Sequence, residues 1–228
     1  MFQKEVKIFG KTIKLNYRNN VDLTVANEVL VNRGYRLCED AIKNAKGPII
    51  DIGGHLGFFS LMASALRTSL PIYCFEPHIE NFELLKRNLK DNDIQNVVAK
   101  QVAVSDVIGE VELLLSREDL NHSLREAIEP TGKIQTVQAT TLEKIFEQYK
   151  INHCGLLKID CEGSEYEILY STPKSIFDRI QAIFLEYHEW SEKGLADALK
   201  IHLEKMGFRV KKIPNAKMKE LGYLWAIK

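Results

Sequence analysis

Hydrophobic positions fall into short apolar runs separated by longer segments in which apolar residues recur every three or four positions. The short runs are typical of strands buried on both faces of a sheet, and the longer segments are typical of amphipathic helices. The expected core strands are 48–52, 72–75, 97–104, 155–160 and 180–186. The expected helices are 58–67, 79–91, 140–149, a segment ending at 170, and 193–206.

This order of strands and helices predicts an α/β fold with a doubly wound, mostly parallel, Rossmann-like sheet. Residues 208–213 and 222–227 follow the last helix as two further strands, and we expect them to form an antiparallel pair that brings the sheet to seven strands. Residues 110–115 and 134–139 also alternate and predict an antiparallel insertion. The polar stretch 116–133 between them is either a substrate loop or a disordered segment.

The N-terminal residues lie outside the strand–helix pattern. Residues 6–17 alternate around Gly10-Lys11, which predicts a hairpin, and residues 24–45 have one apolar helical face. We therefore expect residues 1–46 to form a hairpin-and-helix cover over a main domain of residues 47–228, within one globular unit.

Composition narrows the functional classes. The 228 residues are 45% hydrophobic, with 31 basic and 31 acidic side chains, so the balance does not indicate a strongly basic nucleic-acid surface. No run approaches the roughly 20 apolar residues that span a bilayer, and the N-terminus lacks a signal-peptide core, so a cytoplasmic protein is expected. No Cys-x-x-Cys pair occurs, which predicts buried free thiols at Cys38, Cys74, Cys154 and Cys161.

The turn after the first core strand, Asp51-x-Gly53-x-x-x-Gly57, predicts a ligand site. Glycine permits positive φ, and the next helix presents unpaired N–H groups. Gly53 and Gly54 are adjacent, so the dinucleotide fingerprint fits poorly, and this turn contains no Gly-Lys-Ser/Thr of a P-loop. The Asp51 carboxylate would repel a pyrophosphate but suits an ammonium group, although it could instead cap the turn.

Glu76 ends the next strand, 19 residues after Gly57. A carboxylate at that place can accept hydrogen bonds from both hydroxyls of a ribose. A ribose joined to an ammonium-bearing tail, without pyrophosphate, describes S-adenosylmethionine (SAM). Further polar residues end the later strands, where parallel sheets bind ligands: Ser105, Asp106, Asp160, Glu162, Glu186 and His188.

With these motifs the chain resembles the FkbM-type SAM-dependent methyltransferases over about residues 30–190. The resemblance rests on Asp51-x-Gly-Gly-x-x-Gly, Phe75-Glu76-Pro77, Thr141-Leu142-Glu143, Leu185-Glu186-Tyr187-His188 and, above all, Leu157-Lys158-Ile159-Asp160-Cys161-Glu162-Gly163-Ser164-Glu165. Glu143 stands where the family often has Asp. The resemblance implies a class I methyltransferase fold and O-methylation of a small molecule or sugar.

The resemblance also implies roles for individual residues. Those expected to bind the cofactor are Asp51, Gly53, Gly54 and Gly57 at the methionine half, Glu76 and Pro77 at the ribose, and Ala103 and Val104 at the adenine. Those expected near the transferred methyl are Lys158, Asp160 and Glu162.

Methyl transfer to oxygen requires an aligned acceptor and a route for its proton. Asp160, Glu162, Glu186 and His188 follow neighbouring strands, and we expect Asp160 or His188 to act as the base. The same groups could instead hold Mg²⁺ or a similar ion, although no metal site is assigned.

The fourth strand lacks an Asn-Pro-Pro-Tyr motif, which argues against a nucleic-acid acceptor and favours a small molecule or glycan. Two alternatives remain, an NAD(P)-dependent Rossmann oxidoreductase and a non-catalytic SAM-binding module. The acceptor and the oligomeric state stay open.

Overall fold

A seven-stranded sheet crosses the molecule in the order β11-β12-β10-β9-β3-β4-β5. The computed structural model describes residues 1–116, 122–124, 130–190, 193–216 and 218–228. The strands are β3 (Ile49–Ile52), β4 (Ile72–Phe75), β5 (Val97–Lys100), β9 (Leu156–Ile159), β10 (Ala182–His188), β11 (Arg209–Pro214) and β12 (Leu221–Ile227). β12 is antiparallel to both neighbours and the other pairs are parallel, which confirms the expected fold class.

The direction of winding reverses at β3. The chain runs from β3 outward through β4 and β5, then returns to the other side of β3 for β9 and β10. In such sheets ligands bind beyond the carboxyl ends of the strands at this reversal. The connecting helices are α3 (Phe58–Leu66), α4 (Ile79–Asp91), α5 (Leu142–Gln148), α6 (Glu165–Ser171), α7 (Lys174–Phe177) and α8 (Leu195–Lys205).

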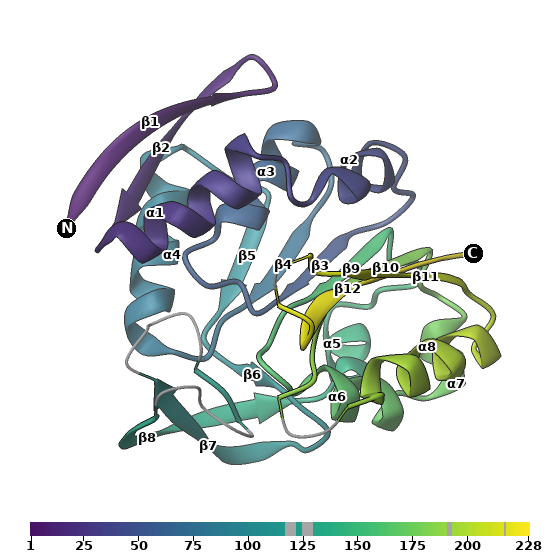
Figure 1. Cartoon of the computed structure of the whole chain (residues 1–228). Helices are drawn as coiled ribbons and strands as arrows, with labels where there is room; N and C mark the ends of the chain where they lie inside the picture. Colours follow the sequence, from purple (N-terminus) through teal and green to yellow (C-terminus); the bar gives the residue numbers. More distant parts are fainter. Residues whose placement is uncertain (117–121, 125–129, 191–192, 217) are drawn as a thin grey trace.

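Alternate residues of the central strands pack into two hydrophobic cores, one on each face of the sheet. Ile49 and Leu156 belong to the core covered by α3 and α4. Ile50 and Leu157, one residue further on, belong to the core covered by α5–α8. Figure 1 shows these two helical layers on opposite sides of the sheet. Burial on both faces explains why the core strands are near-continuous apolar runs.

The N-terminal cover begins with a hairpin, β1 (Phe2–Ile8) and β2 (Lys11–Tyr17), as expected. The side chains of two asparagines, Asn88 of α4 and Asn92 at its C-cap, hydrogen-bond to the backbone of β2. Asn88 bonds the backbone N–H and C=O of Asn16, and Asn92 bonds those of Lys14. Asn88 also donates to the carbonyl of Leu56 in the glycine turn. The hairpin is thereby attached to the turn that begins the expected ligand site.

The single helix expected over 24–45 is wrong. The chain forms α1 (Asn20–Ala26), a π-helical turn η1 (Asn27–Val31) and α2 (Arg36–Lys43), with a break between η1 and α2. Arg33 lies in the left-handed region at φ 57° within that break. The break lets the Tyr35 ring pack against Phe59 and Phe184, and this burial outweighs the local helical pattern.

The single strand expected over 97–104 is also wrong. β5 ends at Lys100, and β6 (Ala103–Val104) pairs instead with the insertion strands β7 (Gly109–Ser116) and β8 (Pro130–Thr140) in a separate three-stranded sheet. β7 and β8 are antiparallel, as expected, but β8 begins earlier than residue 134. Of the expected loop 116–133, residues 117–121 and 125–129 lie outside the described residues.

The described residues include no helix that is long and apolar enough to cross a bilayer. The cysteines agree with the expectation from the sequence. All four are free, with Cys38, Cys74 and Cys154 buried and Cys161 partly exposed. Cys38, Cys74 and Cys154 therefore serve as small apolar side chains within the cores, whereas Cys161 lines a cavity.

Candidate functional site

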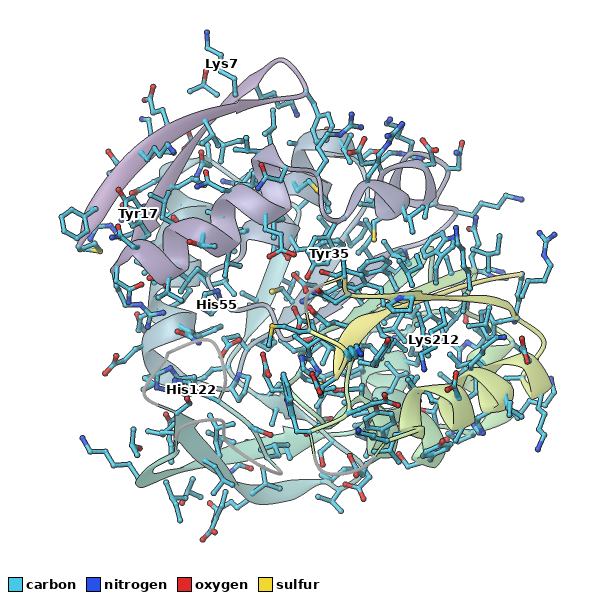
Figure 2. The ribbon with its side chains drawn as sticks, viewed as in Figure 1. Lys7, Tyr17, Tyr35, His55, His122 and Lys212 are labelled. Atoms are coloured by element: carbon cyan, nitrogen blue, oxygen red, sulfur yellow. The ribbon has the colours of Figure 1, made fainter. Side chains whose placement is uncertain are left out.

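A cavity of about 620 Å³ lies at the carboxyl ends of β3, β4, β9 and β10. Cavities of this volume are typical of small-ligand sites. Figure 2 labels three of its lining residues, Tyr35, His55 and His122, which come from three separate parts of the chain. The N-terminal cover and the β7–β8 insertion therefore both help to enclose the site, together with the strand ends.

The glycine turn is held against the strands on both sides of β3. The N–H groups of Gly53 and Gly54 both donate to the carbonyl of Phe75 at 3.0 Å. Gly53 has φ +74°, and a Cβ at this position would lie 1.6 Å from the carbonyl oxygen of Asp160. This close approach requires glycine at 53. Of the glycines predicted to bind cofactor, Gly53 lines the cavity, whereas Gly54 and Gly57 lie behind its wall.

Asp51 and Lys158 are paired with each other behind the same wall. The register of β3 and β9 places them side by side, and Lys158 Nζ lies 3.2 Å from Asp51 Oδ1. Ser60 Oγ donates to the other carboxylate oxygen at 2.7 Å. Burial by itself would lower the pKa of Lys158, but the carboxylates of Asp51 and Asp160 outweigh it and hold that pKa above its ordinary value. Neither Asp51 nor Lys158 lines the cavity.

Lys158 also connects this pair to the glycine turn. Its Nζ donates to the carbonyl of Gly53 at 2.8 Å and lies 3.7 Å from Asp160 Oδ2. The expected contacts of Asp51 with the cofactor and of Lys158 with the methyl group stay predictions. The geometry shows directly that the two charges fix the turn relative to β9.

Glu76 lies where the sequence predicts it, at the end of β4 and in the cavity wall. Its carboxylate accepts the N–H of His55 at 2.7 Å and the N–H of His78 at 2.9 Å. Burial raises the pKa of Glu76 to about 7, against the lowering effect of these two hydrogen bonds. Such a buried carboxylate has a large desolvation cost, which hydroxyl donors from a ligand would reduce.

His55 is a cavity residue that the sequence analysis missed. Its backbone is in the left-handed region at φ 48°, which directs its N–H to Glu76. Burial lowers the pKa of His55 to about 3, although Asp22 acts in the opposite direction. The ring is therefore neutral at physiological pH. Its position directly after Gly53-Gly54 was the only signal in the sequence.

The part of the cavity next to Glu76 is mainly apolar. Ala103 and Val104 of β6 lie there, as expected, even though they belong to the smaller sheet. The remaining apolar residues of this part are Phe75, Pro77, Leu113 and Leu124. Flat apolar walls beside a carboxylate suit a nucleoside, with its base against the walls and its hydroxyls at Glu76.

At the ends of β9 and β10 lies a group of charged side chains that we call the acidic cluster: Asp160, Glu162, Glu186 and His188. One ligand atom from each of Asp160, Glu186 and His188 lies within 4.8 Å of the other two. Tyr35 donates its hydroxyl to Asp160 Oδ2 at 3.2 Å. The structure thus brings together all four residues that the sequence proposed for the chemistry.

A buried glutamate orients His188. Glu165 Oε1 accepts the backbone N–H of His188 at 2.9 Å and lies 3.0 Å from His188 Nδ1. His188 Nε2 lies 3.5 Å from Glu162 Oε2. Burial by itself would lower the pKa of His188, but Glu165 and Glu162 outweigh it and raise the pKa to about 10. Glu165 belongs to the recognised motif, but its role emerges only from the fold.

The carboxylates of the acidic cluster are partly desolvated. Burial raises the pKa of Glu162 to about 7, opposed by His188. Burial and then Asp160 raise the pKa of Glu186 well above its ordinary value. Glu162 has a left-handed backbone at φ 54°, and its carbonyl accepts the Ser123 hydroxyl at 2.6 Å. The insertion is therefore in direct contact with the segment that follows β9.

The charges of the cavity discriminate between the predicted ligands. Among its described lining residues there is no lysine or arginine. A dinucleotide pyrophosphate would have no lysine or arginine among these residues to bind, and the nearby carboxylates would repel it. The residues fit a cationic nucleoside better, with Glu76 at the hydroxyls and the acidic cluster near the positive charge.

Comparisons with known proteins agree with this geometry. A family model described as the Methyltransferase FkbM domain matches residues 51–210. Methyltransferase sdnD of Sordaria araneosa is 26% identical over 204 residues, covering 76% of this chain and 78% of its own. The 31-O-demethyl-FK506 methyltransferase FkbM of Streptomyces tacrolimicus is 25% identical over 171 residues, covering 62% of this chain and 65% of that protein.

A solved structure shares the fold. It is SMU.1697c of Streptococcus mutans in complex with SAH, at TM-score 0.56 and 11% identity, covering 85% of this chain and 97% of that one. The family match extends from the glycine turn to β11, and thus includes all of the strand ends that form the cavity. The chain belongs to the Methyltransferase FkbM domain family.

Proposed function

We propose that the protein transfers a methyl group from SAM to a hydroxyl of a small molecule or sugar. The observation that carries this proposal is that one cavity contains Glu76 and the acidic cluster, with Gly53 of the glycine turn also in its wall. Family membership supports methyl transfer. The SAH complex of SMU.1697c and the O-methyl position in the name of the Streptomyces relative support the cofactor and the type of acceptor.

In this proposal the cofactor spans the cavity. Glu76 accepts hydrogen bonds from the ribose hydroxyls, and Pro77, Ala103 and Val104 pack against the adenine. The Gly53 backbone approaches the methionine half, because glycine leaves the main chain accessible there. The sulfonium then lies near the acidic cluster, whose negative charge favours the cationic cofactor over neutral SAH.

The acceptor oxygen attacks the methyl carbon, the carbon–sulfur bond breaks, and its electron pair stays on sulfur to form neutral SAH. The hydroxyl proton passes to a carboxylate of the acidic cluster. His188 is a poorer acceptor of this proton, since its two ring nitrogens are directed at Glu165 and Glu162. Tyr35, which bonds Asp160, helps to orient the carboxylate.

Isothermal titration calorimetry with SAM, SAH and NAD⁺ tests the cofactor. We expect binding of SAM and SAH, loss of both in Glu76→Ala, and no binding of NAD⁺. SAH release over a panel of hydroxylated acceptors then tests catalysis. Binding of NAD⁺ alone would refute the proposal, and SAM binding without SAH release from any acceptor would favour the non-catalytic alternative.

A further inference from the structure

We propose that Asp160, Glu186 and His188 form a site for one divalent cation, of the Mn²⁺ or Mg²⁺ type, at the acceptor end of the cavity. The inference concerns cation binding by these side chains. Only its catalytic consequence, described below, rests on the proposed function.

The three side chains have the separation that a shared cation needs. One ligand atom from each lies within 4.8 Å of the other two. Metal–oxygen and metal–nitrogen bonds are about 2.1 Å long, so neighbouring ligand atoms of an octahedral ion are about 3.0 Å apart and opposite ones about 4.2 Å apart. Small rotations of the carboxylates would close the remaining distance. Glu186 and His188 are two residues apart in β10 and share one face of the strand.

His188 has the support that metal-binding histidines usually have. Its Nδ1 faces the carboxylate of Glu165 at 3.0 Å, and Glu165 is fully buried. This contact fixes the ring. Nε2, which lies 3.5 Å from Glu162 Oε2, would exchange its proton and that contact for the cation. A carboxylate–histidine–metal arrangement of this kind orients the ring and increases its basicity.

An independent observation points to a bound group in the same cavity. Ser164 lines the cavity and is only 3% exposed, yet its hydroxyl has no hydrogen-bond partner. Ser164 is also the N-cap of α6, but its side chain makes no capping bond. A buried hydroxyl without a partner costs about 1–3 kcal/mol. A water or acceptor oxygen on the cation would supply the missing partner.

The excess of carboxylates over basic side chains around the site also favours binding of a cation. The neighbouring carboxylates are those of Asp51, Asp160, Glu162, Glu165 and Glu186. Lys158 and His188 are the basic side chains paired with them in these contacts. Desolvated charges are stable when they are paired or coordinate a metal. A divalent ion would offset part of the excess, with His188 bound in its neutral form.

If the proposed function holds, the cation has a clear part in it. Bound to the acceptor oxygen, it would lower the pKa of the hydroxyl and hold the oxygen in line with the methyl group. Asp160, Glu186 and His188 would then be ligands. Glu162, the remaining carboxylate of the acidic cluster, would receive the proton.

Electron paramagnetic resonance of free Mn²⁺ tests the site without a known acceptor. We expect the full chain, stripped with EDTA, to bind one Mn²⁺, in competition with Mg²⁺. Asp160→Asn and Glu186→Gln should each weaken binding at least about tenfold. Glu28→Gln removes another carboxylate of the same cavity and should change the affinity less than about threefold. Circular dichroism confirms that each variant is folded.

Two outcomes would overturn the inference. One is the absence of Mn²⁺ and Mg²⁺ binding by the wild-type chain up to about 1 mM, the weak end of protein sites. The other is unchanged Mn²⁺ affinity in both ligand variants, which would place the ion elsewhere. SAM titrations in EDTA report separately on the proposed function, so a chain that binds SAM but no cation refutes the cation site alone.

Discussion

Removal of the Lys158 charge should destabilise the fold more than any exposed charge change. In Lys158→Met the side chain keeps its length, but Asp51 remains fully buried without the ammonium that lay 3.2 Å away. Removing one partner of a buried ion pair lowers the free energy of unfolding by about 3–5 kcal/mol, because the other charge stays buried without compensation. The carbonyl of Gly53 also loses its 2.8 Å donor, so we expect the upper part of that range.

The two partners should not contribute equally. In Asp51→Asn the ammonium of Lys158 keeps a second carboxylate, Asp160, at 3.7 Å, so the cost should be smaller, about 1–3 kcal/mol. The double variant contains neither charge. It should be more stable than Lys158→Met alone, with a coupling energy of about 1–3 kcal/mol.

Urea unfolding followed by circular dichroism at pH 7 measures these differences as changes in midpoint at constant m-value. Lys144→Met is the matched control, because Lys144 pairs with Glu147 at 3.1 Å on an exposed surface and should cost below about 1 kcal/mol. A cost under 1 kcal/mol for Lys158→Met, or additive costs in the double variant, would refute the assignment. Unchanged SAM affinity in Asp51→Asn would further show that Asp51 acts through the fold.

Three other predictions test the site and its supports. Gly53→Ala should lower the free energy of unfolding, measured in urea, by about 3 kcal/mol or more, because the new Cβ would meet the carbonyl of Asp160. Gly10→Ala, at a similar φ but in open space, should lower it by about 1–2 kcal/mol, and equal losses would contradict the prediction. Asn88→Ala should lower the free energy of unfolding by about 3 kcal/mol, because it leaves buried backbone groups unpaired. Asn92→Ala, at a more exposed position, should lower it clearly less. The reverse order would show that Asn88 does not attach the hairpin to α4. SAM affinity should fall as pH drops through about 7, because Glu76 becomes protonated and accepts ribose hydroxyls less well, and calorimetry of Glu76→Gln should show a smaller step, since Glu162 still titrates in this range.

The same Glu76 shift has a consequence for stability with a definite sign. Because burial raises its folded-state pKa from 4.5 to about 7, the folded state binds a proton that the unfolded state releases between these values. The contribution of Glu76 to stability is therefore most favourable below about pH 4.5 and is lost as pH rises through 7. Glu76 therefore destabilises the free protein under the conditions in which its carboxylate is charged.

Much of the fold follows from local patterns. The apolar runs before Asp51, Glu76 and Asp160 are strands because both of their faces are buried, and their order along the chain predicts the winding. Helix 79–91 has the bounds expected from its periodicity. The predicted helix and strand bounds are wrong near Tyr35 and Ala103, where contacts with residues distant in the sequence determine the backbone conformation.

The amino-acid sequence by itself determined the sheet, the glycine turn, the carboxylates at the strand ends and the family, since each depends on short segments whose periodicity or spacing is visible locally. Only the tertiary structure decided which charges face the ligand and which face each other. Asp51 and Lys158 are 107 positions apart and pair through strand register, and Glu165 orients His188 across two elements. Such contacts depend on packing between remote segments, for which a single sequence contains no local signal.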